Sequence, residues 1–320
     1  MDGNRPMPES RPLRRAAAVA GLLLALLAPA VAVSGCGSSL AQAQPGKILA
    51  VGAENEYANV ISQIGGRYVQ VSAIMSNPNT DPHTFEASPS VAQEVGRAQL
   101  VVQNGVGYDD FMSKIESASS SSGRKVIDVQ ALEHLPDSTP NPHLWYKPAT
   151  MPLVARAVAL DLSKLQPAHA AYFRANASRF DRSLQPLRAA LAQFAHEHPR
   201  VAVATTEPVA DYLLQAAGVA NLTPFSMQAD IMNGTDPAPQ AISAQNGLFA
   251  HRRVQAFVYN QQVTDSVTQE FLARARQAGV PVVGVYETMP TPGYDYQSWM
   301  MAELHALERA VTEGRSTTTL

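Results

Sequence analysis

The feature that most constrains the fold of this chain is an alternation of short apolar strands with single helices, which occurs twice. The first half has predicted strands at 47–51, 68–74, 100–102 and 125–129, with helices at 57–65 and 90–97. The second half has strands at 201–205, 254–259 and 280–285, and helices at 209–217, 266–278 and 296–313. Strands separated by helices are typical of a parallel sheet covered by helices on both faces. We therefore expect an α/β fold with two lobes, each a mainly parallel sheet with flanking helices.

A long periodic apolar pattern separates the two halves. Its residues step alternately by four and three positions: Phe173, Ala177, Phe180, Leu184, Leu187, Leu191 and Phe194. This spacing places them on one stripe of a helix. Pro186 lies inside the pattern and should kink the helix or break one backbone hydrogen bond. We expect residues 167–198 to form one long rigid helix that joins an N-terminal lobe (47–166) to a C-terminal lobe (199–315).

The first residues resemble a secretory signal. Arg11, Arg14 and Arg15 precede an uncharged run at 16–35, and Cys36 follows it. A positive segment, an apolar run and small residues at the end are typical of a signal peptide, although a run of this length could also span a bilayer permanently. The order Val-Ser-Gly-Cys resembles a bacterial lipobox, in which the Cys is lipidated and becomes the N-terminus.

These features predict a signal peptide at 1–35 and a lipidated tether at 36–46. Acyl chains on Cys36 would hold the protein at a membrane surface without spanning the membrane. We therefore expect an extracytoplasmic protein, at the cell surface or in a periplasm.

The cysteine count, the net charge and the glycine pattern exclude several classes of function. Cys36 is the one cysteine, so an internal disulfide and a thiolate zinc cluster are excluded. The formal net charge is −3; without residues 1–35 the chain keeps 20 of its 24 basic and 25 of its 27 acidic residues, a net charge of −5. No nucleic-acid partner is expected for such a chain. Gly105 and Gly107 lack the third glycine of a dinucleotide motif.

Four candidate metal ligands follow predicted strands. His83 and His143 share the frame x-Pro-His-x-aromatic, in which the proline stiffens the approach to the imidazole. Glu207 lies where the strand at 201–205 ends, and Asp295 lies beyond the strand at 280–285. Ligands of open α/β sheets collect at the carboxyl ends of strands. Each lobe thus contributes two candidates.

Two imidazoles and two carboxylates suit a divalent first-row cation. Four protein ligands leave little room for a reactive water, and closed sites of this kind bind metal without catalysing a reaction. Each residue also has a plainer interpretation. Glu207 could be a favourable charge at a helix N-terminus, and Asp295 could cap the last helix. Other carboxylates of the second half compete with Asp295 for the fourth position: Asp236, Asp265 and Glu287.

Five stretches together resemble one family. They are Asn-Thr-Asp-Pro-His-Thr-Phe-Glu at 79–86, Ala-Gln-Leu-Val-Val-Gln-Asn-Gly at 98–105, Asn-Pro-His-Leu-Trp at 141–145, Thr-Thr-Glu at 205–207, and Gly-Tyr-Asp-Tyr-Gln-Ser-Trp-Met-Met at 293–301. From about residue 47 to 313 the chain is similar to the cluster A-I solute-binding proteins of ABC importers for zinc and manganese. The resemblance implies two lobes joined by a rigid helix with the metal between them.

The resemblance also implies ligands and partners. The family's metal ligands fall on His83, His143, Glu207 and Asp295; the glutamate at the third position favours Mn²⁺, without excluding Zn²⁺, as the transported ligand. Residues expected to line the site or to orient the ligands are Asn104, Trp145 and Tyr294. The partners would be an ABC permease and its ATPase, and we expect a monomer that is not an enzyme.

The alternative function is an extracytoplasmic metal-dependent hydrolase. It would use His83, His143 and Glu207 as ligands and Asp295 as a base. The chain contains no HExxH helix and no paired-cysteine site that would favour such an enzyme.

Overall fold

The computed structural model describes residues 44–320, apart from residues 80, 81 and 291. The predicted signal peptide, Cys36 and most of the predicted tether lie outside the described residues. These described residues all belong to a single unit, Leu40–Leu320. Among the described residues, no helix combines the length and the apolar character that crossing a lipid bilayer requires.

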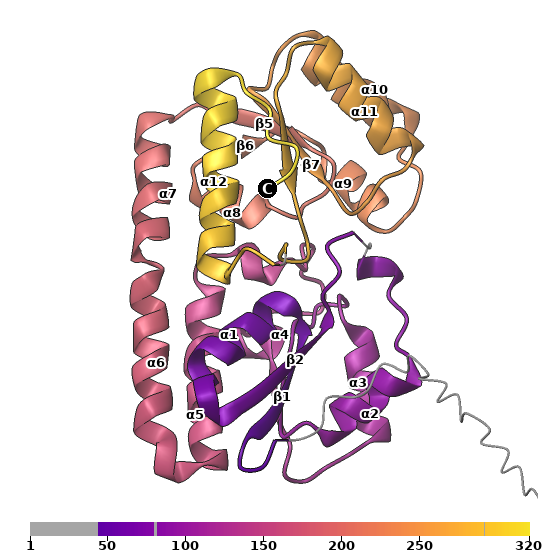
Figure 1. Ribbon diagram of the computed structural model, residues 1–320. Helices are drawn as coiled ribbons and strands as arrows, with labels where there is room; N and C mark the ends of the chain where they lie inside the picture. The colour runs from indigo at the N-terminus through magenta and orange to yellow at the C-terminus, as the bar shows by residue number, and fades with distance from the viewer. Residues whose placement is uncertain (1–43, 80–81, 291) are drawn as a thin grey trace, which may run out of the picture. The chain divides into compact units, whose positions relative to one another are not determined.

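The first lobe contains a four-stranded parallel sheet in the order β2-β1-β3-β4. Its strands are β1 (Ile48–Glu54), β2 (Val69–Met75), β3 (Leu100–Gln103) and β4 (Lys125–Asp128). Figure 1 labels the strands β1 and β2. The helices of this lobe are α1 (Asn55–Gly65), α2 (Pro89–Arg97), α3 (Asp110–Ala118), α4 (Val129–Leu132) and α5 (Thr150–Leu165). Short 3-10 turns lie at η1 (Gly66–Tyr68), η2 (Pro82–Thr84) and η3 (Leu144–Tyr146).

The second lobe repeats this arrangement with the parallel order β6-β5-β7-β8. Its strands are β5 (Ala202–Thr205), β6 (Ala220–Asn221), β7 (Ala256–Asn260) and β8 (Val282–Val285). Its helices are α8 (Asp211–Ala216), α9 (Phe225–Met232), α10 (Pro239–Ala250), α11 (Ser266–Gln277) and α12 (Tyr296–Glu313). In both sheets the strand order reverses beside the first strand, and all carboxyl ends lie at one edge, where such folds bind ligands. The expected α/β architecture is confirmed.

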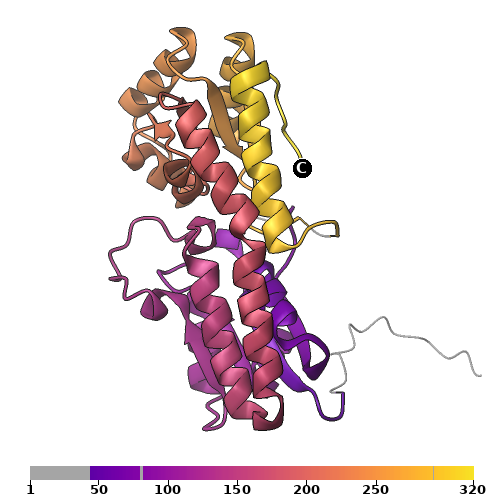
Figure 2. The same ribbon diagram turned by 90° about the vertical axis from the view of Figure 1, so that its left-hand side faces the viewer.

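Two helices placed end to end pass along both lobes (Figures 1 and 2). After the turn η4 (Pro167–His169), α6 (Ala170–Ser183) packs on α5 and α1, and α7 (Gln185–Glu197) packs on α12 and α8. All seven residues of the predicted stripe are buried. The helix is interrupted at Leu184, because Pro186 has no N–H to donate to the carbonyl four residues earlier.

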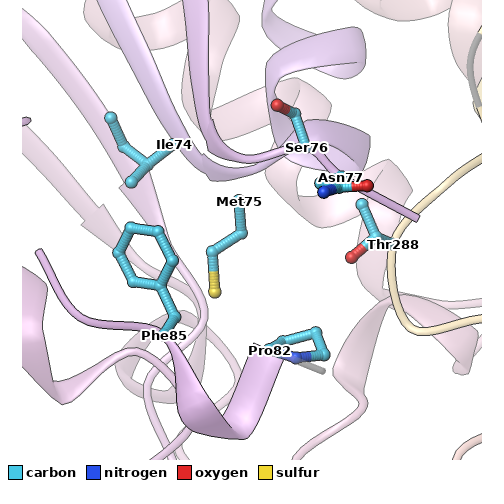
Figure 3. A pocket seen from close by; sticks show the side chains of 7 residues that line it. All are labelled: Ile74, Met75, Ser76, Asn77, Pro82, Phe85 and Thr288. Carbon is cyan, nitrogen blue, oxygen red and sulfur yellow. The ribbon is translucent and has the colours of Figure 1, made fainter. Parts of the chain in front are cut away.

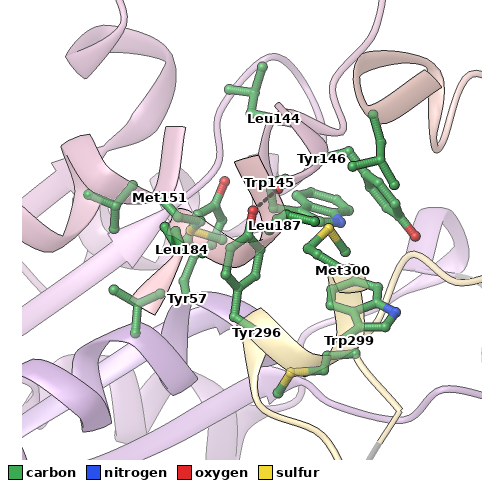
Figure 4. Close-up of a cluster of buried hydrophobic side chains, with 14 of the residues drawn as sticks. Tyr57, Leu144, Trp145, Tyr146, Met151, Leu184, Leu187, Tyr296, Trp299 and Met300 are labelled. Atoms are coloured by element: carbon green, nitrogen blue, oxygen red, sulfur yellow. Dashed lines mark hydrogen bonds between the residues drawn. The ribbon is translucent and has the colours of Figure 1, made fainter. Parts of the chain in front are cut away.

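One buried cluster extends through both lobes. At their junction it contains Tyr57 and Trp145 from the first lobe, Leu184 from the connecting helix, and Tyr296 and Trp299 from the second (Figure 4). The Tyr296 hydroxyl donates to the Trp145 carbonyl at 2.7 Å. Smaller clusters lie under the remaining helices of each lobe. Part of the junction between the lobes is therefore a packed apolar cluster.

Candidate metal centre

Loops at the carboxyl ends of both sheets bring three potential ligands together. His83 lies in η2 after β2, His143 lies directly before η3, and Glu287 follows β8 by two residues. Nε2 of His83 and Nε2 of His143 each lie 3.2 Å from Oε2 of Glu287. Among the described residues, these three offer ligand atoms within 4.8 Å of one another. His143 and Glu287 are fully buried, whereas the His83 side chain is 21% exposed.

Asn141 determines which nitrogen of His143 faces Glu287. The Asn141 amide is oriented by its own contacts, since Nδ2 donates to the Pro208 carbonyl at 2.8 Å and Oδ1 accepts from the His143 backbone N–H at 3.0 Å. Oδ1 also lies 2.7 Å from Nδ1 of His143, so Nδ1 carries the proton. The neutral ring then directs the Nε2 lone pair at the cluster, which is the state that binds a metal.

Polar neighbours hold Glu287 ionised. Oε1 accepts from Nδ2 of Asn260 at 2.7 Å, and Oε2 accepts from the Tyr108 hydroxyl at 3.0 Å. Burial raises the pKa of Glu287, but the hydrogen bonds and positive charge that His143 and His83 supply when they are protonated outweigh burial and hold this pKa well below its usual range. Burial lowers the pKa of His143, which favours its neutral, metal-binding form.

Glu207 lies beside this group at the end of β5. It is buried, and its Oε1 accepts from Nδ2 of Asn260 at 3.1 Å. The same Asn260 amide group donates to Glu287, so a single side chain connects the two carboxylates. The geometry therefore brings together three of the four predicted side chains, either directly or through Asn260, and these are His83, His143 and Glu207.

The structure places Asp295 elsewhere. Asp295 is exposed and caps α12: its carboxylate accepts from the Ser298 backbone N–H at 2.8 Å, and its own N–H donates to the Ser298 hydroxyl at 3.0 Å. Glu287, one of its rivals, takes the position at the imidazoles instead. The physical reason is distance along the chain, since Glu287 follows β8 by two residues and Asp295 follows it by ten. Asp265, a second rival, caps α11.

The residues expected around the site differ in role. Asn104 is buried and donates from Nδ2 to the Pro142 carbonyl at 2.8 Å, which fixes the residue before His143. Trp145 is buried with its ring 5.4 Å from the His143 ring in an edge arrangement. Tyr294 packs against the buried cluster described above.

Sequence reasoning missed four other residues with polar contacts here: Tyr108, Asn141, Asn260 and Gln262. The signal that was available for Asn260 is its place at the carboxyl end of β7.

A cavity of about 240 Å³ adjoins these loops (Figure 3). Its walls include Pro82 and Thr288, the sequence neighbours of His83 and Glu287. The Met75 sulfur and the Phe85 ring lie on its apolar side (Figure 3). The cavity is therefore bordered by the loop that carries His83 and by the loop that carries Glu287.

Comparison with known proteins identifies the family. Residues 51–310 match the model of the ZnuA family, described as zinc-uptake complex component A, periplasmic. The manganese-binding lipoprotein MntA of Bacillus subtilis is 28% identical over 177 residues, which cover 52% of this chain and 56% of that protein. The zinc-binding protein TroA of Treponema pallidum is 25% identical over 183 residues, 55% of this chain and 59% of TroA. The match thus spans less than two thirds of either relative.

Solved structures share the fold over most of the chain. The solute-binding protein FpvC from Pseudomonas aeruginosa, in complex with Mn²⁺, has a TM-score of 0.69 at 22% identity, covering 83% of this chain and 99% of that one. The periplasmic zinc-binding protein TroA from Treponema pallidum has a TM-score of 0.66 at 19% identity. The match covers 84% of this chain and 100% of the TroA chain.

Proposed function

Because the chain belongs to the ZnuA family, whose model matches residues 51–310, we propose that it is an extracytoplasmic solute-binding protein. It captures a divalent transition metal, Mn²⁺ or Zn²⁺, between its two lobes and delivers it to an ABC importer. The observation that carries this proposal is the meeting of His83, His143 and Glu287 at the carboxyl ends of both sheets. The family is one of transport components, and the metal is cargo.

The proposed ligands are His83 and His143 from the first lobe and Glu207 and Glu287 from the second. Two carboxylates cancel the charge of a divalent ion, which reduces the cost of burying it. Lone pairs from two imidazoles and oxygens from two carboxylates suit either metal. MntA is named for manganese and TroA for zinc, and Zn²⁺ should bind an N/O site of this kind more tightly than Mn²⁺.

The partners follow from this role. We propose an ABC permease and its ATPase as the recipients of the metal, because the similar PsaA of Streptococcus anginosus is named as a manganese ABC transporter substrate-binding lipoprotein. We also propose that residues 1–35 are a signal peptide, that Cys36 carries lipid at the start of a tether at 36–46, and that the protein acts as a monomer. The lobes at 47–166 and 199–315 and the linking helix at 167–198 complete this organisation.

The decisive experiment measures metal content and affinity. Protein purified without chelator should contain about one Mn²⁺ or Zn²⁺ per chain by elemental analysis, and competitive titration should rank the two. A His143→Ala variant should lose the metal, while His305→Ala on α12, outside the described cluster, serves as a matched control. A parent chain without stoichiometric metal and without measurable affinity for either ion would contradict the proposal.

Anchoring at Cys36 has its own test. A Cys36→Ala chain should appear in the soluble fraction or remain uncut, because the lipidated residue is missing. Membrane fractionation and mass spectrometry of the N-terminal peptide measure this. An intact Met1 peptide in the membrane-bound parent would show that residues 1–35 form a permanent anchor instead.

A further inference from the structure

Residues 315–320 extend the second sheet beyond β8. After α12 the chain reverses at Gly314, which has a left-handed conformation, and then runs parallel to β8. Thr317 donates its N–H to the Val282 carbonyl, and its own carbonyl accepts from the Gly284 N–H, both at 2.8 Å. The Ser316 hydroxyl accepts from the Val282 N–H at 2.9 Å.

Gly284 allows this segment to approach closely. A Cβ atom at position 284 would lie 2.1 Å from the Thr318 carbonyl oxygen, a distance that no side chain tolerates. Gly284 does not have a positive φ, so the backbone conformation itself does not require glycine. The glycine therefore serves the contact with residues 315–320.

The far end of the segment reaches the residue that precedes Glu287. The Leu320 side chain packs against the buried cluster that includes Tyr286. Burial raises the pKa of Tyr286, whereas the Leu320 backbone lies close enough to the Tyr286 hydroxyl to lower this pKa slightly. The Tyr286 carbonyl accepts from the hydroxyl of Tyr146 at 2.7 Å, and Tyr146 follows His143 by three residues. Tyr286 thus lies between the 315–320 segment and the His143 loop.

The rest of the loop at 286–289 is held separately. The Glu287 and Thr288 N–H groups both donate to Oε1 of Gln262, at 2.6 and 2.8 Å. Asn55 of the first lobe makes two hydrogen bonds with the Met289 backbone. Nδ2 of Asn55 donates to the Met289 carbonyl at 2.8 Å, and Oδ1 of Asn55 accepts from the Met289 N–H at 3.0 Å. Residues 287–289 are thus held by Gln262 and Asn55, whereas Tyr286, at the start of the loop, is held by residues 315–320.

We propose that residues 315–320 are a positioning element for the metal centre, which fixes Glu287 through β8 and Tyr286. The inference rests on the proposed function, because it concerns the affinity of the same site. Partners that orient a ligand of a metal typically contribute about 10- to 100-fold to metal affinity. Loss of this support should therefore weaken binding without removing any ligand.

The experiment compares four proteins: the parent, Gly284→Ala, a chain that ends at Arg315, and the combination of the two changes. Gly247→Ala, whose Cβ would meet nothing within 4 Å, is the matched control. For each, competitive titration gives the Kd for Mn²⁺, electron paramagnetic resonance reports the symmetry of the bound Mn²⁺, and thermal unfolding is measured without metal.

We expect the Kd to rise about tenfold in both single variants, with a changed Mn²⁺ spectrum and unchanged stoichiometry. The combined variant should bind no more weakly than the truncated chain, because both changes act through one contact. A lower melting temperature with the parent's Kd and spectrum would overturn the inference and leave only a structural role. If truncation prevents folding, the Kd and the Mn²⁺ spectrum of Gly284→Ala alone test the inference. A parent that binds neither metal would overturn the proposed function and this inference together.

Discussion

Glu287 and Asp295 lie in the same loop, between β8 and α12, but their carboxylates have opposite environments. Glu287 is buried and touches both imidazoles, whereas Asp295 is exposed and closes a capping box with Ser298. The segment around Asp295 resembles the family's ligand segment, but Asp followed three positions later by Ser is also a helix-start signature. The sequence does not distinguish the two uses, because both need a carboxylate at the end of a loop.

Substitution of the two carboxylates separates these roles. Glu287→Gln preserves the shape but removes a charge from the centre, so we expect the Kd for Mn²⁺ and Zn²⁺ to rise at least 10- to 100-fold. Asp295→Asn should keep the parent's affinity, since asparagine also caps helices well. Competitive titration of both variants measures this. Parent-like affinity in Glu287→Gln together with a large loss in Asp295→Asn would return Asp295 to the ligand set.

The other site residues were easier to predict. His83 and His143 each follow a proline, and Glu207 follows the strand β5 by two residues, so the local pattern places them at the sheet edge. Asn260 and Tyr108 were not predicted, because their contacts with Glu287 connect residues far apart in the chain. Only the folded arrangement of both lobes reveals them.

Among the secondary-structure elements, the junction of α6 and α7 shows how one residue sets a boundary. Pro186 lies in the first turn of α7, where the missing N–H costs little because first-turn donors have no helical partner. The helix therefore stops at Ser183 and restarts at Gln185 with the apolar stripe still in register.

This placement leads to a paired prediction. Pro186→Ala should change the free energy of unfolding by less than about 1 kcal/mol, whereas Ala190→Pro in the middle of α7 should cost about 3 kcal/mol or more. Urea unfolding of both variants measures the difference. A stabilisation of about 3 kcal/mol by Pro186→Ala would mean that the interruption at Leu184 is strained.

Sequence patterns predicted most strands but missed four helices. Helices α3, α4, α9 and α10 and the two-residue strand β6 were not expected. In α10, Ile242 and Phe249 lie seven residues apart, but the positions between them on the same face, Gln245 and Asn246, are polar, so periodicity gives only a weak signal. The strand β6 is too short to show alternation, and its pairing with β5 is a tertiary effect.

At the scale of the whole molecule, a buried carboxyl lies at the junction of the lobes. Oε1 of Glu303 in α12 lies 2.8 Å from the hydroxyl oxygen of Tyr146 in the first lobe and accepts from Nε1 of Trp299 at 2.9 Å. Burial raises the pKa of Glu303 to about 8, although these contacts oppose the shift. The folded protein therefore holds this group neutral at pH values where the unfolded chain ionises it.

The sign of the resulting pH dependence is fixed. The pKa of Glu303 is near 4.3 in the unfolded chain and about 8 in the folded protein. The contribution of the neutral carboxyl to the free energy of unfolding is therefore complete below about pH 4. It declines by about 1.4 kcal/mol per pH unit as the pH rises to about 8. Glu303→Gln keeps an oxygen acceptor and cannot ionise. Relative to the parent, its stability should therefore increase between pH 5 and 8, as urea unfolding at both values would measure. A stability difference that is independent of pH would refute this assignment.

The continuous buried cluster at the lobe junction limits how far the two lobes can separate when metal enters or leaves. Wide separation of the lobes would hydrate the Trp145 and Tyr296 rings, and each large buried apolar side chain costs about 1.5–3 kcal/mol to expose. We therefore expect entry and exit of the metal to displace ligand loops rather than lobes. Small-angle X-ray scattering should then give the same radius of gyration, within error, for metal-free and metal-loaded protein, and a contraction of several ångströms on loading would contradict this expectation. An importer of the kind proposed above would then have to recognise the metal-loaded protein by the local shape of the loops around the metal centre.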